Sequence, residues 1–198
     1  MVDSDVAGRV GERVVISTPY RAITLRLDSN CAAAGTSYAA WDAYHATGGW
    51  QHIAIFDNTS SDVWDLYDWE QLGRWTWRPG GAWDHSYNDV WQNQPYSDIK
   101  IGSWAGVTPT RSGAKVTLNV SAARYAVSLR KFVPSAAAVG QLQYKAPGAT
   151  KWIALKSVKT SSTGKYTYAY TSTAIRDYRV YFPATNVIWN AASATVRK

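Results

Sequence analysis

The chain has 198 residues, a length that fits one large domain or two small ones. Its one cysteine, Cys31, excludes intrachain disulfides and therefore the small disulfide-stapled scaffolds. It contains no apolar run of about eighteen residues, so we expect no membrane-spanning helix.

Charge is divided unevenly along the chain, although the formal net charge is only +7. Residues 1–98 contain six Lys and Arg against thirteen Asp and Glu, a net charge of −7. Residues 99–198 contain fifteen Lys and Arg against one acid, Asp177, a net charge of +14. Such a contrast is hard to arrange within one mixed domain, so charge predicts two domains with different surfaces.

The chain shows short runs of alternating apolar and polar residues, and no convincing helical pattern. Clusters of Gly, Pro, Asn, Asp and Ser separate the runs, as turns separate strands. In the first half the runs cover 22–28, 37–44, 51–57, 62–69, 73–78 and 98–104. In the second half they cover 115–122, 127–133, 140–146, 151–158, 164–171, 178–182 and 194–198. This spacing predicts an all-β protein made of two tandem antiparallel β-sandwiches.

The two sandwiches are predicted to meet in AGVTPTRSGAK, residues 105–115. This segment contains Gly106 and Pro109, and the sign of the charge changes near it. It is too short for a flexible linker, so the chain should pass almost directly from one sandwich into the next. The predicted domains are an acidic, Trp-rich sandwich over 1–106 and a basic sandwich over 107–198.

Three stretches of the second half carry a resemblance to a known family. LQYKAPGATKW (142–152) has the form of a hairpin between central strands, and SSTGKYTYAY (161–170) has a turn that opens an alternating strand. YRVYFPATNVIW (178–189) has the form of a penultimate strand and its loop. Residues 113–198 therefore resemble the tandem bacterial immunoglobulin-like domains of secreted, mostly actinobacterial, surface proteins. The resemblance implies a spacer or adhesive module without catalytic residues, while the first half is assigned to no family.

Four tryptophans lie in QLGRWTWRPGGAWDHSYNDVW, residues 71–91. Trp75 and Trp77 are two residues apart and share one strand face, while Arg and Thr occupy the other, which predicts core packing. Trp83 and Trp91 instead flank DHSYND, which is interpreted as a loop because PGGA before it has the composition of a turn.

Aromatic rings beside short polar groups are typical of a recognition surface, because rings stack on flat apolar ligands such as sugars and polar groups supply hydrogen bonds. The predicted ligand-binding residues are Trp83, Asp84, His85, Tyr87, Asn88, Asp89 and Trp91. The alternative is that the two tryptophans pack in the core or anchor the loop.

Other polar groups of the first half are expected to be structural. Four carboxylates, those of Asp62, Asp65, Asp68 and Glu70, lie within nine residues, which is enough oxygen ligands for Ca²⁺. Because no DxDxDG loop is present, we interpret them as the solvated acidic edge of a strand. The histidines His45, His52 and His85 would suit zinc in number but lack HxH or HxxxH spacing. Cys31 has no basic neighbour to activate it, which favours a small buried residue over a nucleophile. We expect no metal and no cofactor.

The basic half is predicted to attract polyanions such as teichoic acids, anionic lipid headgroups or nucleic acid. Lys145, Lys151 and Lys165 lie near predicted turns and are the expected contacts. The tyrosines of KYTYAY, residues 165–170, share one face at period two, which favours an inward stripe over a base-stacking platform. Specific nucleic-acid recognition is therefore not expected.

Catalytic patterns are scarce, since the chain has two Glu and no GxSxG, HExxH, P-loop or GxGxxG motif. The favoured function is non-catalytic binding or adhesion by a secreted or cell-surface protein, with a cell-envelope glycan or a protein as partner. A structural or adaptor subunit of an extracellular assembly is the second interpretation, and a hydrolase using Asp84, His85 and Asp89 is the third. The opening MVDSDVAGRVGER lacks the apolar stretch of a signal peptide, so the chain is expected to be either intracellular or a mature form.

Overall fold

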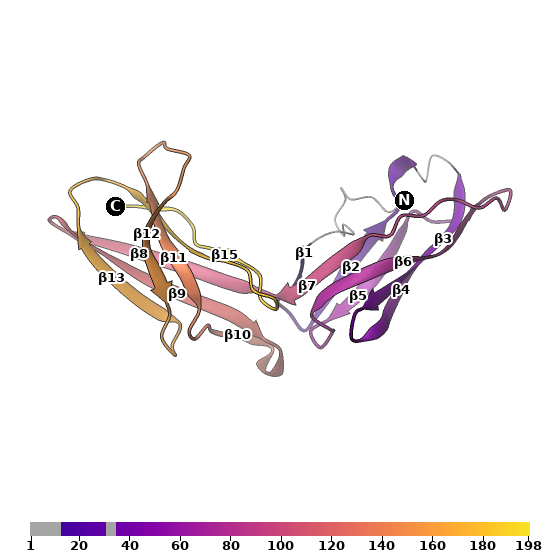
Figure 1. Ribbon diagram of the computed structural model, residues 1–198, viewed down its shortest axis with the longest axis horizontal. Coiled ribbons are helices and arrows are strands. Elements are labelled where there is room, and N and C mark those ends of the chain that lie inside the picture. The colour runs from indigo at the N-terminus through magenta and orange to yellow at the C-terminus, as the bar shows by residue number, and fades with distance from the viewer. Residues whose placement is uncertain (1–12, 31–34) are drawn as a thin grey trace. The chain divides into compact units, whose positions relative to one another are not determined.

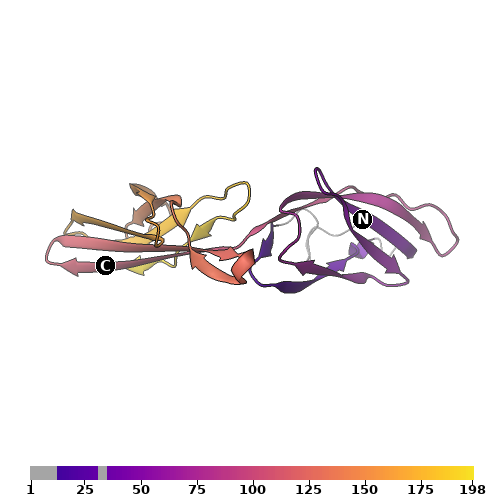
Figure 2. The same cartoon turned by 90° about the horizontal axis from the view of Figure 1, so that it is seen from below.

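The computed structural model describes residues 13–30 and 35–198, and their regular structure is almost entirely β-strand. The predicted all-β class is confirmed. The chain forms two compact units, Met1–Lys100 (unit 1) and Ile101–Lys198 (unit 2), and strands form two layers in each (Figures 1 and 2). Within the described residues, no helix is both long and apolar enough to cross a membrane.

Unit 1 consists of a five-stranded sheet and a two-stranded sheet. The larger sheet has the order β1 (Arg13–Ile16), β7 (Tyr96–Ile101), β6 (Gly73–Asp84), β3 (Thr36–His45) and β4 (Gly49–Asp57). The smaller sheet pairs β2 (Tyr20–Arg26) with β5 (Ser61–Tyr67) along their whole length, with Tyr20 opposite Tyr67. All the pairings of β3, β5 and β6 within these sheets are antiparallel.

The core of unit 1 lies between its two sheets and is built largely of indole rings. Trp64 of β5 packs on Trp75 and Trp77 of β6, with ring centroids 5.2 and 5.5 Å apart. Trp75 and Trp77 are 0% and 1% exposed, which confirms their predicted core role. Trp41 of β3 packs edge-on against Phe56 of β4. Alternation along each strand brings these rings inward, because successive side chains point to opposite faces.

Unit 2 is a second sandwich of two sheets. In one, β9 (Lys115–Ala126) pairs with β8 (Ser103–Ser112) along one edge and with β13 (Lys165–Thr171) and β10 (Lys131–Pro134) along the other. In the second, the order is β12 (Ile153–Lys159), β11 (Val139–Lys145) and β14 (Asp177–Phe182), and β14 also pairs with β15 (Ala191–Ala192) and β16 (Val196–Arg197). A short 3-10 helix, Val127–Leu129, connects β9 to β10.

The core of unit 2 is mainly aliphatic. Val116, Leu118 and Val120 of β9 face Leu142 of β11 and Val180 of β14, and all five are at most 1% exposed. The tyrosines of β13 are partly buried against this cluster, so the inward stripe predicted for KYTYAY is confirmed.

The segment predicted as the junction between the domains, residues 105–115, is not a linker. It belongs to the β8–β9 hairpin of unit 2, whose turn contains Gly113 at a φ of 57°. The prediction relied on Gly106, Pro109 and Gly113 and on the change in the sign of the charge. Among the described strands, however, β8 pairs with β9 alone, and an outer strand tolerates the missing N–H of proline. The two units divide at Lys100 and Ile101, a few residues before the predicted boundary.

Candidate functional site

The predicted recognition segment begins inside a strand, which corrects the loop interpretation of Trp83. β6 continues to Asp84, and the stretch predicted as a turn, residues 79–82, lies within it. The pairing of β3 with β6 shifts register opposite this stretch, and Gly81 has a φ of 114°. A β-bulge uses glycine at positive φ as a turn does, so composition alone did not distinguish the two.

The turn after β6 is held together by the carboxylate of Asp84. This carboxylate accepts hydrogen bonds from the backbone N–H groups of Ser86 (2.7 Å) and Asn88 (2.9 Å) and from Asn88 Nδ2 (3.0 Å). The side-chain bond from Asn88 is the main cause that lowers the pKa of Asp84. Asp84 and Asn88 therefore shape the turn, and a carboxylate so engaged is poorly suited to the proton transfers that the hydrolase interpretation requires.

A hollow of about 450 Å³ lies beside this turn. Trp83 forms one side of it and stacks on Tyr38 of β3, with ring centroids 4.1 Å apart and 13° between the ring planes. The hollow is lined by Ser37, Tyr38, Asp57, Asn58, Trp83, His85 and Tyr87. Three predicted ligand-binding residues, Trp83, His85 and Tyr87, thus line one hollow beside polar groups from β3 and the β4–β5 turn.

The remaining predicted residues lie outside the hollow. Asp89 forms an isolated backbone bridge with Trp83, and its side chain is exposed. Trp91 is 70% exposed and does not line the hollow. Trp83 is half-buried, so neither tryptophan is a core residue like Trp75.

A second aromatic surface, which the sequence analysis did not predict, lies on the outer face of the β2–β5 sheet and the turn after β5. Tyr20, Tyr67 and Trp69, here called the aromatic strip, are 49%, 38% and 67% exposed. The ring centroids of Tyr20 and Tyr67 are 5.3 Å apart, and Trp69 stacks on Tyr67 at 5.3 Å and 13°. The hydroxyl of Tyr20 donates to Asp65 Oδ1 (2.8 Å).

The signal for part of this strip was present in the sequence. Asp65 and Tyr67 of β5 alternate with the buried Trp64 and Leu66, so parity places these two on the outer face. Trp69 lies in the turn after β5 and joins them by stacking on Tyr67. Tyr20 joins them only because β2 pairs with β5 in this register.

The aromatic strip differs from the tyrosines on the larger sheet, whose ring faces are covered by guanidinium groups. Arg78 lies over Tyr44 at 4.2 Å, and Arg74 lies over Tyr96 at 3.9 Å. Arg74 also forms a bidentate ion pair with Asp98 (2.9 and 3.0 Å). In the part of the chain that the structure describes, no cation lies over Tyr67 or Trp69.

The carboxylates and histidines considered for metals have separate surroundings. Asp62 accepts from the N–H groups of Ile55 and Val63 (2.9 and 2.7 Å). His45 Nε2 donates to the carbonyl of Leu72 (3.1 Å), whereas the ring of His52 packs against the core indoles of Trp64 and Trp77. Over residues 13–30 and 35–198, no three His, Cys, Asp or Glu side chains are grouped as a metal site. Cys31 lies outside the described residues.

The predicted polyanion contacts of unit 2 are divided between its two sheets. Lys145 Nζ lies 5.2 Å from the ring centre of Trp152, and Arg179, which the sequence analysis did not single out, lies 4.4 Å from it. Lys151 is exposed and precedes Trp152. Lys165 begins β13 in the opposite sheet, so it does not belong to this group.

No sequence-family model matches the chain, and no curated sequence matches it. The chain has distant structural similarity to the fibronectin(III)-like modules of CbhA from Clostridium thermocellum, at 14% identity and a TM-score of 0.35 over 100% of this chain and 90% of that one. It is similar to the FN1–FN3 domains of chicken CNTN1, at 13% identity and a TM-score of 0.34 over 94% and 64% of the two chains. It is also similar to the BSP domain of a biofilm associated protein, at 10% identity and a TM-score of 0.27 over 93% and 28%. Similarities this distant concern the fold alone, and the actinobacterial relationship stays a prediction.

Proposed function

We propose that this chain is a non-catalytic binding protein of the cell surface or extracellular space, and that unit 1 binds a glycan. The observation that carries the proposal is the aromatic strip, in which three contiguous rings are exposed, two on the β2–β5 sheet and Trp69 in the turn after β5. Exposed apolar groups that gather into one patch mark interaction sites more often than scattered ones do. The fold does not require them there, because the core of unit 1 is already filled by Trp64, Trp75 and Trp77.

The chemistry of the strip suits a sugar ring. One face of a pyranose presents C–H groups that pack on an aromatic ring, while its hydroxyl groups require hydrogen-bond partners at the edge. The outer ring, Trp69, supplies the largest exposed apolar face of the three. Asp65 supplies the partner, because its Oδ1 accepts from Tyr20 and its Oδ2 has no partner among the described residues.

The hollow beside Trp83 is a second proposed glycan contact. It combines the stacked rings of Tyr38 and Trp83 with the polar side chains of Asp57, Asn58 and His85. Tyr87, at 84% exposure, lies at its rim. Trp91 and Asp89, which lie outside the hollow, are proposed to contribute only if the ligand extends beyond it.

The test is binding of the full chain to a glycan array and to insoluble cell-wall polysaccharide. We expect Trp69→Ala to abolish retention and Tyr87→Ala to weaken it, with unchanged thermal melting for both. Trp50→Ala is the matched control, because Trp50 is a 54% exposed tryptophan of unit 1 whose indole N–H donates to Asp42 instead. Absence of any glycan ligand, or equal retention of wild type and Trp69→Ala, refutes the proposal for the strip.

A second candidate function, electrostatic attraction of polyanions, is favoured by the two cations that converge on Trp152. Heparin is a suitable probe, because such attraction weakens as salt screens it over a Debye length of about 8 Å at physiological strength. We expect Lys145→Gln and Arg179→Gln to reduce heparin retention more than Lys165→Gln does. Retention that is insensitive to salt contradicts this candidate.

A further inference from the structure

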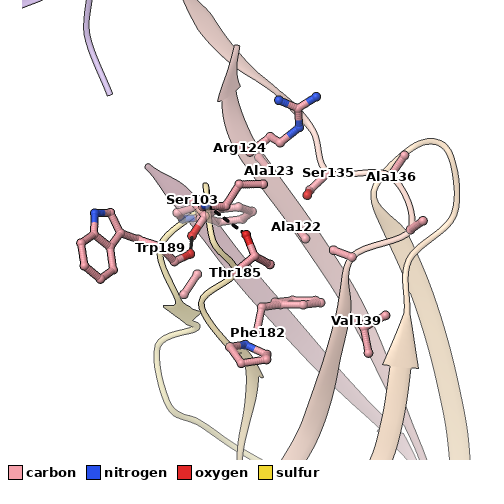
Figure 3. Close-up of a pocket in the computed structure, with 16 residues that line it drawn as sticks. Ser103, Ala122, Ala123, Arg124, Ser135, Ala136, Val139, Phe182, Thr185 and Trp189 are labelled. Carbon is pink, nitrogen blue, oxygen red and sulfur yellow. Dashed lines mark hydrogen bonds between the residues drawn. The ribbon is translucent and has the colours of Figure 1, made fainter. Parts of the chain in front are cut away.

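Unit 2 contains an apolar pocket of about 380 Å³ at one end of its sandwich (Figure 3). Its walls come from both sheets, namely from β8 and β9 on one side and from β11, β14 and β15 on the other. The segment 135–138 and the loop from Pro183 to Trp189 complete it. The volume falls within the range of about 300–1,000 Å³ that is usual for small-molecule sites.

Six of the sixteen residues that line the pocket are alanines, whose short side chains leave the space open. Ala122, Ala191 and Phe182 are 6%, 8% and 7% exposed and form a floor that is continuous with the unit 2 core. Ala136 and Ala138 border it on another side, where a larger residue would fill the space. An apolar ligand on this floor would extend the hydrophobic core without opening it.

One end of the pocket carries hydrogen-bond donors that have no partner among the residues that the structure describes. The guanidinium of Arg124 makes no hydrogen bond and no ion pair with any described residue, and the hydroxyl of Ser135 makes none either. The two residues lie on neighbouring segments, because Val133 pairs with Arg124 and the N–H of Ser135 donates to the carbonyl of Ala122 (2.9 Å). Figure 3 shows both side chains at the same end, away from Phe182.

The other hydroxyl groups of the pocket are already engaged. Ser103 donates to the carbonyl of Trp189 (2.6 Å), and Thr185 Oγ1 accepts from the N–H of Ile188 (3.0 Å), as the dashed lines in Figure 3 mark. Polar recognition is therefore concentrated at Arg124 and Ser135.

From this arrangement we infer that the pocket binds a small amphipathic carboxylate, such as a medium-chain fatty acid. The apolar body packs on Phe182 and Ala122, and the carboxylate accepts hydrogen bonds from the guanidinium of Arg124 and the hydroxyl of Ser135. Charge complementarity favours an acid over an alcohol or an amine. Asp177 is the one acidic side chain of residues 99–198, and Arg197 engages both of its oxygens (2.7 and 3.1 Å), so no carboxylate of unit 2 competes for Arg124.

The inference is tested by isothermal titration of the full chain with decanoate, and with decanol and decylamine as probes of equal chain length. We expect decanoate to bind most tightly and Arg124→Gln to weaken it about tenfold or more, because a hydrogen bond to a charged group is lost. Arg124→Lys should retain part of the affinity. Lys131→Gln is the matched control, since it removes an exposed cation of the same sheet that does not line the pocket.

A second variant locates the site. Ala136→Phe fills the pocket at an exposed position, so it should leave the melting of unit 2 unchanged and weaken decanoate and decanol alike. Three results overturn the inference: no binding of decanoate, equal binding by Arg124→Gln, or equal binding by Ala136→Phe. Light scattering that shows a dimer of the wild type, lost in Ala136→Phe, overturns it as well, because a second copy would then cover the pocket.

Discussion

The two units are both two-layered sandwiches, yet their cores are made of different residues. In unit 1, four tryptophans, Trp41, Trp64, Trp75 and Trp77, are at most 1% exposed. In unit 2, the corresponding space is filled by Val, Leu and Tyr side chains, with no tryptophan among the buried residues. The difference teaches that a sandwich requires apolar side chains at alternate positions and leaves their chemical type open.

The units also differ in how their buried polar groups are satisfied. In unit 2, the buried carboxylate of Asp177 is bonded to Arg197, and the buried hydroxyl of Thr160 donates to the carbonyl of Ser135 (2.6 Å). In unit 1, His52 Nε2 and Trp64 Nε1 are buried without a hydrogen-bond partner among the described residues. Each such atom destabilises the folded state, because it lost hydration without gaining a partner.

The largest expected effect concerns the boundary between the units. A fragment of residues 101–198 should fold cooperatively, because it retains β8 and all ten of its pairs with β9. A fragment of residues 113–198 should be unfolded, since it loses β8 and the buried Ala105 and Val107. Circular dichroism during urea denaturation measures the folding and the stability of each fragment. Equal stability of the two fragments would show that β8 is dispensable to unit 2.

The next effect distinguishes core from surface tryptophans in unit 1. Trp77→Ala should cost unit 1 about 3–5 kcal/mol, because it leaves a cavity and removes the partner of the Ser97 hydroxyl (3.0 Å). Trp69→Ala should change stability by less than about 0.5 kcal/mol, since the ring is exposed. Urea denaturation of the full chain measures both. A similar loss of stability in the two variants would mean that the exposed fraction of a tryptophan does not distinguish a core residue from a surface residue in unit 1.

A smaller effect compares close packing in the two units. In unit 2, a Cβ at Gly140 would lie 2.5 Å from Phe182 Cδ1 and 2.6 Å from the carbonyl oxygen of Tyr181. Gly140→Ala should therefore cost about 1–3 kcal/mol, because backbone cannot move aside cheaply. Gly48→Ala in unit 1 is the control, since its Cβ would meet side-chain atoms and no backbone atom at this range, namely Gln51 Nε2 at 2.8 Å and Gln71 Cγ at 3.1 Å. The comparison fails if Gly48→Ala is the more destabilising variant in urea.

The smallest effect on stability is a pH dependence that unit 1 alone should show as the pH falls below about 6.5. Burial lowers the pKa of His52 in the folded state, although Asp62 and Asp65 oppose this. The pKa of histidine in the unfolded chain is about 6.5. Below this pH the unfolded chain therefore binds a proton at His52 more readily than the folded chain does, so the free energy of unfolding decreases as the pH falls. Unit 2 contains no histidine and should not respond in this range.

His52→Gln should flatten the decline of the unit 1 melting temperature with pH, whereas His85→Gln, at an exposed position, should leave it in place. Scanning calorimetry of the wild type and both variants measures this. If the melting temperature of unit 1 in His52→Gln falls with pH as steeply as in the wild type, the pH dependence belongs to other groups.

Several features of this protein follow from the sequence by itself. The strand content, the inward Trp75 and Trp77, and the tyrosine stripe of β13 were all predictable, because alternation at period two is a local property of the chain. The division of charge between the halves was equally local, since it needs only the positions of the ionisable residues. For Trp83, His85 and Tyr87, composition pointed to the segment that lines the hollow.

The tertiary structure decided everything that depends on strand pairing and register. It joined Tyr20 to Tyr67 across β2 and β5, brought Arg179 to Lys145 at Trp152, and turned the Gly- and Pro-containing segment of β8 into a paired strand. It also placed Arg124 beside Ser135 at the end of an apolar pocket. Such groupings arise from contacts between residues far apart in the chain. The local composition of a strand does not specify its partner or its register, so these groupings could not be predicted from composition.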